Sequence, residues 1–224
     1  MKFLFKYATR ERPDRFFTNL AAYYSLLSHR HDYQFLVTID QDDPTMNNCE
    51  VLNNLHGWPD LITCINPNRG KICAINYGMD QASDWDILIV VSDDMKPIVL
   101  YFDDLMANAM QKHYPKLGGA LHYHDGKYGQ DKCITLSVMG KALYDHFGYI
   151  YHPDYLSVFC DNEFTDEVYR MNCVKFYRNI LIMHDWIGES EPDELHRINE
   201  ALSAKDHETY NKRKALKFPK ESIF

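Results

Sequence analysis

Short apolar runs alternate with amphipathic stretches along the first 110 residues, and this alternation restricts the fold more than any other feature. The apolar runs predict strands at residues 2–9, 33–39, 61–65 and 87–91. The run ILIVV at 87–91 is apolar on both faces, which is typical of a strand covered by helices on two sides. Apolar positions three and four apart predict helices over 14–28 and 71–82. The pattern indicates an α/β fold with a mostly parallel central sheet flanked by helices.

The second half of the chain is less regular. Strands are expected near 118–122 and 133–139, and helices near 141–147 and 162–171. A last apolar run at 180–183 precedes a charged tail with sparse apolar positions, typical of a surface helix. Since no repeat or flexible linker divides the sequence, we expect one domain over residues 1–190, with halves at 1–115 and 116–190. A helical tail, 191–224, is expected to pack on it.

Composition excludes several classes of protein. With 46% hydrophobic and 25% charged residues, the chain has the profile of a globular protein. A net charge of −8 argues against a nucleic acid partner, because nonspecific affinity for nucleic acids comes from lysine and arginine. The six cysteines form no C-x-x-C pair and are expected to be reduced. Because no secretory signal or run of about 20 apolar residues is present, we expect a cytoplasmic protein without a transmembrane segment.

The sharpest chemical feature is Ser92-Asp93-Asp94, which directly follows the apolar run 87–91. Ligands of open α/β sheets bind beyond the carboxyl ends of the strands, where these acids are expected to lie. Carboxylates there can hold Mg²⁺ or Mn²⁺, and such an ion bridges the phosphate oxygens of a diphosphate. The alternative is a polar turn that caps a helix.

Two further segments are expected at the same edge of the sheet. Arg69-Gly70-Lys71 opens a predicted helix, and a helix N-terminus with a glycine and two cations suits an anion. Asp40 ends a predicted strand, where it can accept hydrogen bonds from a base or a ribose. A solvated basic turn and a helix cap are the respective alternatives.

The order of these motifs resembles the Rossmann-like glycosyltransferase-A fold, and especially the inverting enzymes of glycosyltransferase family 2. Ala8-Thr9-Arg10 with Arg12 resembles the entry loop of that family, and Asp40 resembles its nucleobase-contacting carboxylate. The stretch 66–71 with Ala74 and Asn76 resembles the G-K-x-x-A-x-N helix near the diphosphate. The resemblance implies a nucleotide-sugar site formed by Thr9, Arg10, Arg12, Asp40, Arg69, Lys71, Asn76, Ser92 and Asp93.

Ser92-Asp93-Asp94 resembles the family's metal-binding D-x-D motif, but its first carboxylate is displaced. Val91 or Ser92 stands where an acid is usual, so the resemblance leaves open which aspartate binds the metal. His184 resembles the late histidine that completes the metal site in some enzymes with this fold. The implied ligands of Mn²⁺ or Mg²⁺ are therefore Asp93, Asp94 and His184.

The segment FCDNEF at 159–164 resembles the acidic motif that supplies the family's catalytic base. Asp161 is the first choice for this base, and Glu163 is the second. In an inverting transfer the base removes the proton of the acceptor hydroxyl, while the metal stabilises charge on the departing diphosphate. The alternative is that both acids only complement a helix dipole.

The resemblance thus implies a metal-dependent hexosyltransferase that moves a sugar from a nucleotide-diphosphate donor, expected to be a UDP-sugar, to a hydroxyl acceptor with inversion. Residues 1–115 would bind the nucleotide and 116–190 the acceptor. One alternative is a non-catalytic nucleotide-sugar-binding domain of the same fold. Another is a sugar-phosphate nucleotidyltransferase, although the loop ATRERPDR lacks the glycines usual there. A third is a zinc hydrolase that uses His122, His124, Asp125 and His184.

Overall fold

A seven-stranded sheet forms the centre of the protein. The computed structural model describes residues 1–68, 70–127, 131–184, 197–198 and 201–223. The strands of the sheet are β1 (Lys2–Thr9), β2 (Asp32–Asp40), β3 (Leu61–Asn66), β4 (Ile87–Val91), β6 (Ala120–Tyr123), β7 (Val138–Gly140) and β8 (Val174–Tyr177). Their order is β3-β2-β1-β4-β7-β6-β8, and β7 runs antiparallel to both of its neighbours while the other pairs are parallel. The predicted α/β class with a mostly parallel sheet is confirmed.

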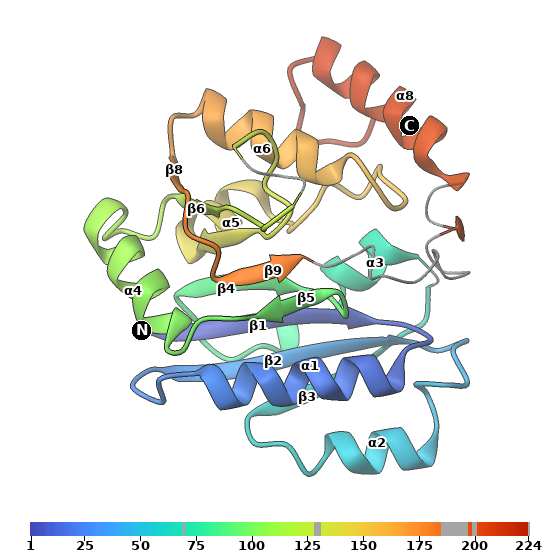
Figure 1. Ribbon diagram of the computed structural model, residues 1–224. Coiled ribbons are helices and arrows are strands. Elements are labelled where there is room, and N and C mark those ends of the chain that lie inside the picture. Colours follow the sequence, from blue (N-terminus) through green and yellow to red (C-terminus); the bar gives the residue numbers. More distant parts are fainter. Residues whose placement is uncertain (69, 128–130, 185–196, 199–200, 224) are drawn as a thin grey trace.

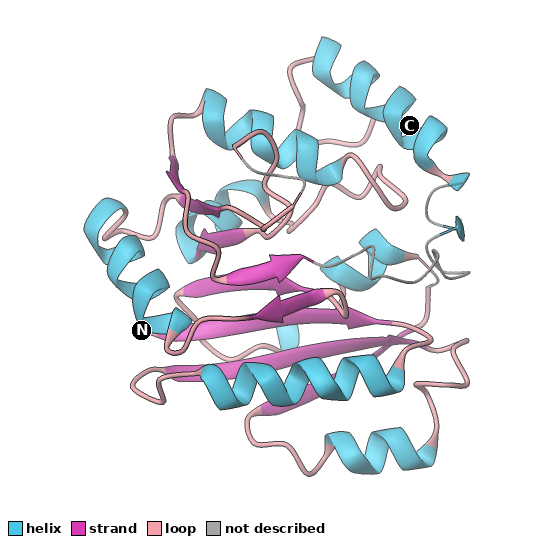
Figure 2. Cartoon of the chain, viewed as in Figure 1, coloured by secondary structure: helices cyan, strands magenta, loops and turns pink. Residues whose placement is uncertain are grey.

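Helices cover both faces of this sheet (Figure 2). They are α1 (Pro13–Leu26), α2 (Cys49–Leu55), α3 (Lys71–Asn76), α4 (Phe102–His113), α5 (Lys141–Phe147), α6 (Cys160–Arg170) and α8 (Ser203–Ala215). Side chains alternate along β1, so Phe3 and Phe5 join an apolar layer with α1 and α4, whereas Leu4 joins another with α3, α5 and α6. The sheet therefore separates two cores, as expected for strands buried on both faces.

Several elements differ from the sequence-based expectations. The predicted helix 71–82 ends at Asn76, because Tyr77 is extended and Gly78 takes a left-handed conformation with φ 77°; a 3-10 turn, η1 (Met79–Gln81), follows. The predicted strand 133–139 contracts to β7. Helix α4 and strand β8 were not predicted. A second sheet, also unpredicted, pairs β5 (Met95–Pro97) with β9 (Ile182–His184) in antiparallel fashion.

Both halves expected from the sequence contribute to the seven-stranded sheet, since β1 to β4 lie before residue 115 and β6 to β8 after it. The domain boundaries stay a prediction. None of the helices in the described part of the chain combines the length and apolar composition needed to cross a membrane.

The C-terminal helix α8 packs against α6, at the top of the view in Figure 1. Its buried side chains are Asp206, Thr209 and Arg213, which stand three and four positions apart and so share one face of the helix. This face is polar, which explains why the sparse apolar residues of the tail give a weak amphipathic signal. Ion pairs and hydrogen bonds, rather than an apolar stripe, attach α8 to the domain.

Candidate functional site

The parallel strands bring the ends of four segments to one edge of the sheet. Strand pairing places Thr9 beside Ile39, and Asp40 beside Asn66, while Tyr7 lies beside Val91, the last residue of β4. The residues that follow β1, β2, β3 and β4 therefore emerge together. This is the edge at which open α/β sheets bind ligands.

Asp93 is buried immediately beyond β4, with 3% of its surface exposed. Thr9 Oγ1 donates to Asp93 Oδ2 at 3.1 Å, and the Asn19 side-chain amide donates to the Asp93 main-chain carbonyl. Burial raises the pKa of Asp93 to about 7, against the charge of Arg12. Asp93 Oδ1 is buried without a hydrogen bond from any described residue. Asp93 thus has unused acceptor capacity at the sheet edge.

Asp94 points toward His184, with His184 Nε2 3.5 Å from Asp94 Oδ2. The approach follows from the β5–β9 pairing, which sets His184 opposite Met95. Burial acts to raise the pKa of Asp94, but the hydrogen bond and charge of His184, together with Ser92, hold that pKa well below its usual range. Buried His184 Nδ1 has no hydrogen-bond partner among the described residues. A carboxylate therefore lies next to an imidazole whose second nitrogen has no hydrogen-bond partner among the described residues.

A cavity of about 110 Å³ opens beside this pair. Its lining combines polar side chains from five parts of the chain with apolar ones. The polar residues are Lys71, Ser92, Thr135, Ser157, Asp161 and His184. The apolar part includes Ala8, Ile75, Val91, Met95 and Val158. The fold thus gathers predicted site residues Lys71, Ser92, Asp161 and His184 around one space.

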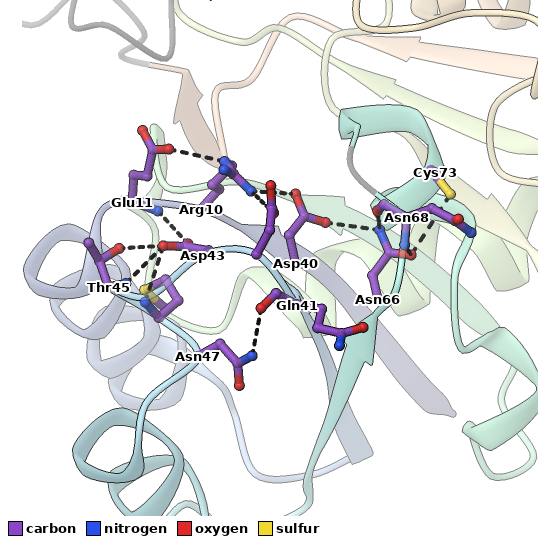
Figure 3. A network of polar contacts seen from close by, with 12 residues as sticks. Arg10, Glu11, Asp40, Gln41, Asp43, Thr45, Asn47, Asn66, Asn68 and Cys73 are labelled. Carbon is purple, nitrogen blue, oxygen red and sulfur yellow. Dashed lines mark hydrogen bonds and ion pairs between the residues drawn. The ribbon is translucent and has the colours of Figure 1, made fainter.

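Asp40 lies in a separate polar network at the same edge (Figure 3). Arg10 Nη1 donates to Asp40 Oδ2 at 3.1 Å and to Asp42 Oδ1 at 2.6 Å. The Asn66 side chain donates to Asp40 Oδ1 at 2.9 Å. Burial raises the pKa of Asp40, although the hydrogen bonds from Asn66 and Arg10 oppose it. Arg10 and Asp40, both predicted binding residues, are therefore in direct contact, and sequence reasoning missed Asn66 as their partner.

The remaining predicted binding residues have different settings. Lys71 begins α3 after Gly70, whose φ of 135° favours glycine. Arg12 is the N-cap residue of α1. Asn76 lies at the far end of α3, where its side chain donates to the Tyr151 carbonyl and accepts from the N–H groups of Ile150 and Tyr151. Arg69 lies outside the described residues.

The two candidate bases have unlike surroundings. Asp161 lies in the first turn of α6 and lines the cavity. Glu163 lies in the same turn of α6, but both of its oxygens accept hydrogen bonds from the Arg213 guanidinium, at 2.7 and 2.9 Å. Tyr155 also donates to Glu163, at 2.8 Å. Glu163 thus serves as the anchor of α8, whereas Asp161 faces open space.

A second group with metal-binding character lies elsewhere, and no sequence motif indicated it. Ligand atoms of His31, Asp103 and Asp104 lie within 4.8 Å of one another. His31 directly precedes β2, and Asp103 and Asp104 lie in the first turn of α4. The group therefore lies at the amino end of β2. Arg30 donates to Asp104 at 2.6 Å, and Ser28 donates to both oxygens of Asp103. The Arg30 guanidinium thus offsets the charge of Asp104, and Ser28 engages both oxygens of Asp103.

Comparison with known proteins identifies the fold. No family model and no curated relative matches the sequence. Mannosyltransferase PcManGT from Pyrobaculum calidifontis, in complex with GDP-Man and Mn²⁺, is similar with a TM-score of 0.68 and 15% identity, over 95% of this chain and 64% of that one. TarS 1-349 from S. aureus is similar in complex with UDP, with a TM-score of 0.62 and 14% identity over 82% of this chain and 60% of that one.

The same TarS protein in complex with UDP-GlcNAc gives a TM-score of 0.60 and 15% identity, over 92% of this chain and 66% of that one. The chain thus spans 60 to 66% of the length of these solved structures. At such low sequence identity the likeness establishes the fold, which is that of glycosyltransferase-A proteins.

Proposed function

We propose that this chain is a metal-dependent glycosyltransferase that moves a sugar from a nucleotide-diphosphate donor, a UDP-sugar, to a hydroxyl acceptor with inversion. The observation that carries this proposal is the cavity at the sheet edge, because its lining includes a cation, an imidazole that is paired with a carboxylate outside the lining, and a second carboxylate. Lys71, Asp94 with His184, and Asp161 supply these three groups. The solved structures with this fold include complexes with UDP, UDP-GlcNAc and GDP-Man, which supports a nucleotide-sugar as the ligand.

The diphosphate would bind near Lys71, at the start of α3. An ammonium group there offsets the negative charge of phosphate oxygens. Ser92 also lines the cavity, and its hydroxyl donates to Asp94. Buried Asp93, which accepts a hydrogen bond from Thr9, would hold the turn after β4 in place. Asn76 is assigned no ligand contact, because its side chain is engaged with residues 150 and 151.

A divalent metal fits beside Asp94 and His184. Carboxylate oxygens are preferred ligands of Mg²⁺ and Mn²⁺, and an imidazole nitrogen is acceptable to Mn²⁺. Buried His184 Nδ1 and Asp93 Oδ1 have no hydrogen bond within the described residues, so the site has capacity for a further partner. When bound, the ion would supply positive charge that stabilises the departing diphosphate. We assign its ligation to Asp94 and His184; Asp93 is left out, because the ligand atoms of these three residues do not all lie within 4.8 Å of one another.

Asp161 is proposed as the base. Its carboxylate borders the same cavity as Lys71 and His184, so an acceptor hydroxyl can lie between it and the donor. An ionised carboxylate at that position takes the hydroxyl proton as the oxygen attacks the anomeric carbon from the side opposite the leaving group, which inverts the configuration. Glu163 is left out of this role, because Arg213 and Tyr155 occupy its oxygens.

Asp40 is proposed to bind the nucleobase. A carboxylate has about four acceptor positions, so Asp40 can accept an N–H of uracil beside its bonds from Arg10 and Asn66. Arg10 can donate to a carbonyl oxygen of the base with its remaining N–H groups. Thr9, Arg12 and Arg69 are retained as predicted residues of the donor site.

The experiment combines binding and turnover. Calorimetry with UDP-GlcNAc and GDP-Man, with and without Mn²⁺, is expected to show metal-dependent binding of the UDP-sugar, and release of the nucleoside diphosphate is expected on incubation. In Asp161→Asn the donor affinity should stay unchanged while turnover falls by about 10²- to 10⁴-fold. Asp166→Asn, on the same helix but paired with Lys214, is the matched control.

Two results would contradict the proposal. If Asp161→Asn kept the turnover of the wild type, the base would have to be another group. If the wild type bound the donor without releasing any nucleoside diphosphate, the chain would be a nucleotide-sugar-binding domain and not an enzyme.

A further inference from the structure

The segment from Leu156 to Phe159 forms part of the cavity but belongs to no helix or strand. Ser157 and Val158 line the cavity, and the chain then enters α6, which carries Asp161 in its first turn. Phe159 has a left-handed backbone with φ 63°, an unfavourable conformation for a residue with a side chain. A buried N–H group needs a hydrogen-bond partner. Because this segment lies in no helix or strand, the partners of its N–H groups must be acceptors other than those of a helix or a sheet ladder.

Asp206 of α8 supplies those partners. Its carboxylate accepts hydrogen bonds from three successive backbone N–H groups, those of Leu156 at 2.9 Å, Ser157 at 2.7 Å and Val158 at 2.8 Å. Asp206 is fully buried. Hydrogen bonds from N–H groups to an ionised carboxylate are shorter and stronger than those to neutral acceptors. One side chain therefore determines the path of three residues beside the proposed base.

The position of Asp206 is itself fixed relative to α6. Further along α8, the Arg213 guanidinium makes its two hydrogen bonds to Glu163. Tyr210 and Lys214 donate to Asp166 at 2.7 and 2.8 Å. These contacts lock α8 onto the same helix that carries Asp161. A shift of Asp206 would thus be transmitted to the wall of the cavity while α8 stayed attached.

We infer that Asp206 is a positioning residue for glycosyl transfer: it holds the segment Leu156–Val158 so that the acceptor side of the cavity keeps its shape next to Asp161. This inference rests on the proposed function of that cavity. The parts of the site assigned to the donor, Lys71, Asp94 and His184, come from other elements than Asp206. Asp206 consequently affects turnover and acceptor use, and leaves binding of the donor intact.

The test uses the full chain with Asp206→Asn, which keeps the size of the side chain but turns one acceptor into a donor that opposes an N–H group. Turnover is expected to fall by about ten- to a hundredfold, since displacements of about 1 Å have effects of this size. Affinity for UDP-GlcNAc with Mn²⁺, measured by calorimetry, should equal that of the wild type. Amide hydrogen exchange should quicken at Leu156, Ser157 and Val158 and stay unchanged in β1.

Two further variants separate positioning from general stability. Asp166→Asn removes the charge to which Tyr210 and Lys214 bind and so weakens these exposed bonds, while the buried Arg213–Glu163 pair still holds α8, so its turnover should match the wild type. Asp206→Glu retains the charge and lengthens the side chain by one methylene. It should lower turnover with donor affinity intact, and it serves as the test variant if Asp206→Asn does not fold.

The outcomes separate the positioning role of Asp206 from the proposed function of the cavity. If the wild type is active and the folded Asp206 variants turn over at the same rate as the wild type, the positioning role of Asp206 is wrong. The proposed function is then unaffected. Equal loss of turnover in Asp166→Asn would also overturn the positioning role, because any loosening of α8 would then suffice. A wild type that neither binds nor turns over a nucleotide-sugar would overturn the proposed function itself, and the inference with it.

Discussion

His184 Nε2 lies 3.5 Å from Asp94 Oδ2, although the two residues belong to distant parts of the chain. The two-stranded sheet of β5 and β9 is responsible, because it pairs His184 with Met95, the neighbour of Asp94. A short secondary sheet therefore completes the proposed metal site at the edge of the main one.

If this pair holds the metal, Asp94→Asn and His184→Ala should each weaken Mn²⁺-dependent binding of UDP by about tenfold or more, because each removes a ligand atom. Calorimetry with and without Mn²⁺ measures the effect. Asp161→Asn is the control, since it removes a carboxylate of the cavity that the proposal does not assign to the metal. Wild-type affinity in both Asp94→Asn and His184→Ala would exclude the metal role.

Asp40 offers a test of nucleobase binding. Asp40→Asn retains one acceptor oxygen but loses the charge that Arg10 contacts. UDP should bind about ten- to a hundredfold more weakly, because a hydrogen bond to a charged group contributes about 1.5–3 kcal/mol. Pyrophosphate with Mn²⁺ lacks a base and should bind as it does to the wild type. Equal weakening for both ligands would argue against contact between Asp40 and the base.

The anchor of α8 gives a prediction about stability. Glu163→Gln removes one of the two carboxylates that pair with the fully buried Arg213 and leaves Asp154, 3.1 Å from Nη1, so the free energy of unfolding should fall by about 1.5–3 kcal/mol. Asp166→Asn breaks an exposed ion pair and should lower it by about 1 kcal/mol or less. Urea denaturation followed by circular dichroism compares the two variants. A similar small loss of unfolding free energy in both variants would show that the buried Glu163–Arg213 pair stabilises the fold no more than an exposed ion pair does.

Lys6 predicts an unusual dependence of stability on pH. It is fully buried, its ammonium group donates to Thr38 Oγ1 and to the Tyr77 carbonyl, and burial lowers its pKa to about 8 from 10.5. Between these two values the unfolded chain binds more protons than the folded one, so the contribution of Lys6 to the free energy of unfolding increases with pH.

The comparison is with Lys6→Met, which cannot titrate. From pH 8 to 10.5 the wild type should gain up to about 3 kcal/mol relative to this variant. Urea denaturation at several pH values measures the difference, and the titration of tyrosines cancels between the two proteins. A difference that stays constant over this range would show that Lys6 keeps its ordinary pKa.

The first half of the fold could be predicted because its strands are apolar and separated by clear turns. Helix α4 has a helical pattern of apolar residues too, since Phe102, Met106 and Met110 stand four positions apart, although it is not among the predicted helices. Strand β8 could not be recognised in this way, because it is short and only partly buried. The β5–β9 pair depends on long-range contact between two three-residue strands, which no local pattern encodes.

The sequence indicated the edge of the sheet at which the candidate site lies, because acidic and basic residues follow the apolar strands there. It ranked Asp161 above Glu163 only by resemblance, since both stand in the first turn of α6. Their difference depends on Arg213, which comes from the C-terminal helix. Asn76 matched a motif, yet its partners at residues 150 and 151 are remote in sequence.

The polar inner face of α8, formed by Asp206, Thr209 and Arg213, has a thermodynamic consequence. Exposing polar surface lowers the heat capacity, whereas exposing apolar surface raises it. Detachment of α8 would therefore have a much smaller heat-capacity change than unfolding of the sheet and its two apolar layers. In a calorimetric trace the step in heat capacity would come from the loss of the sheet and hardly at all from the release of this helix.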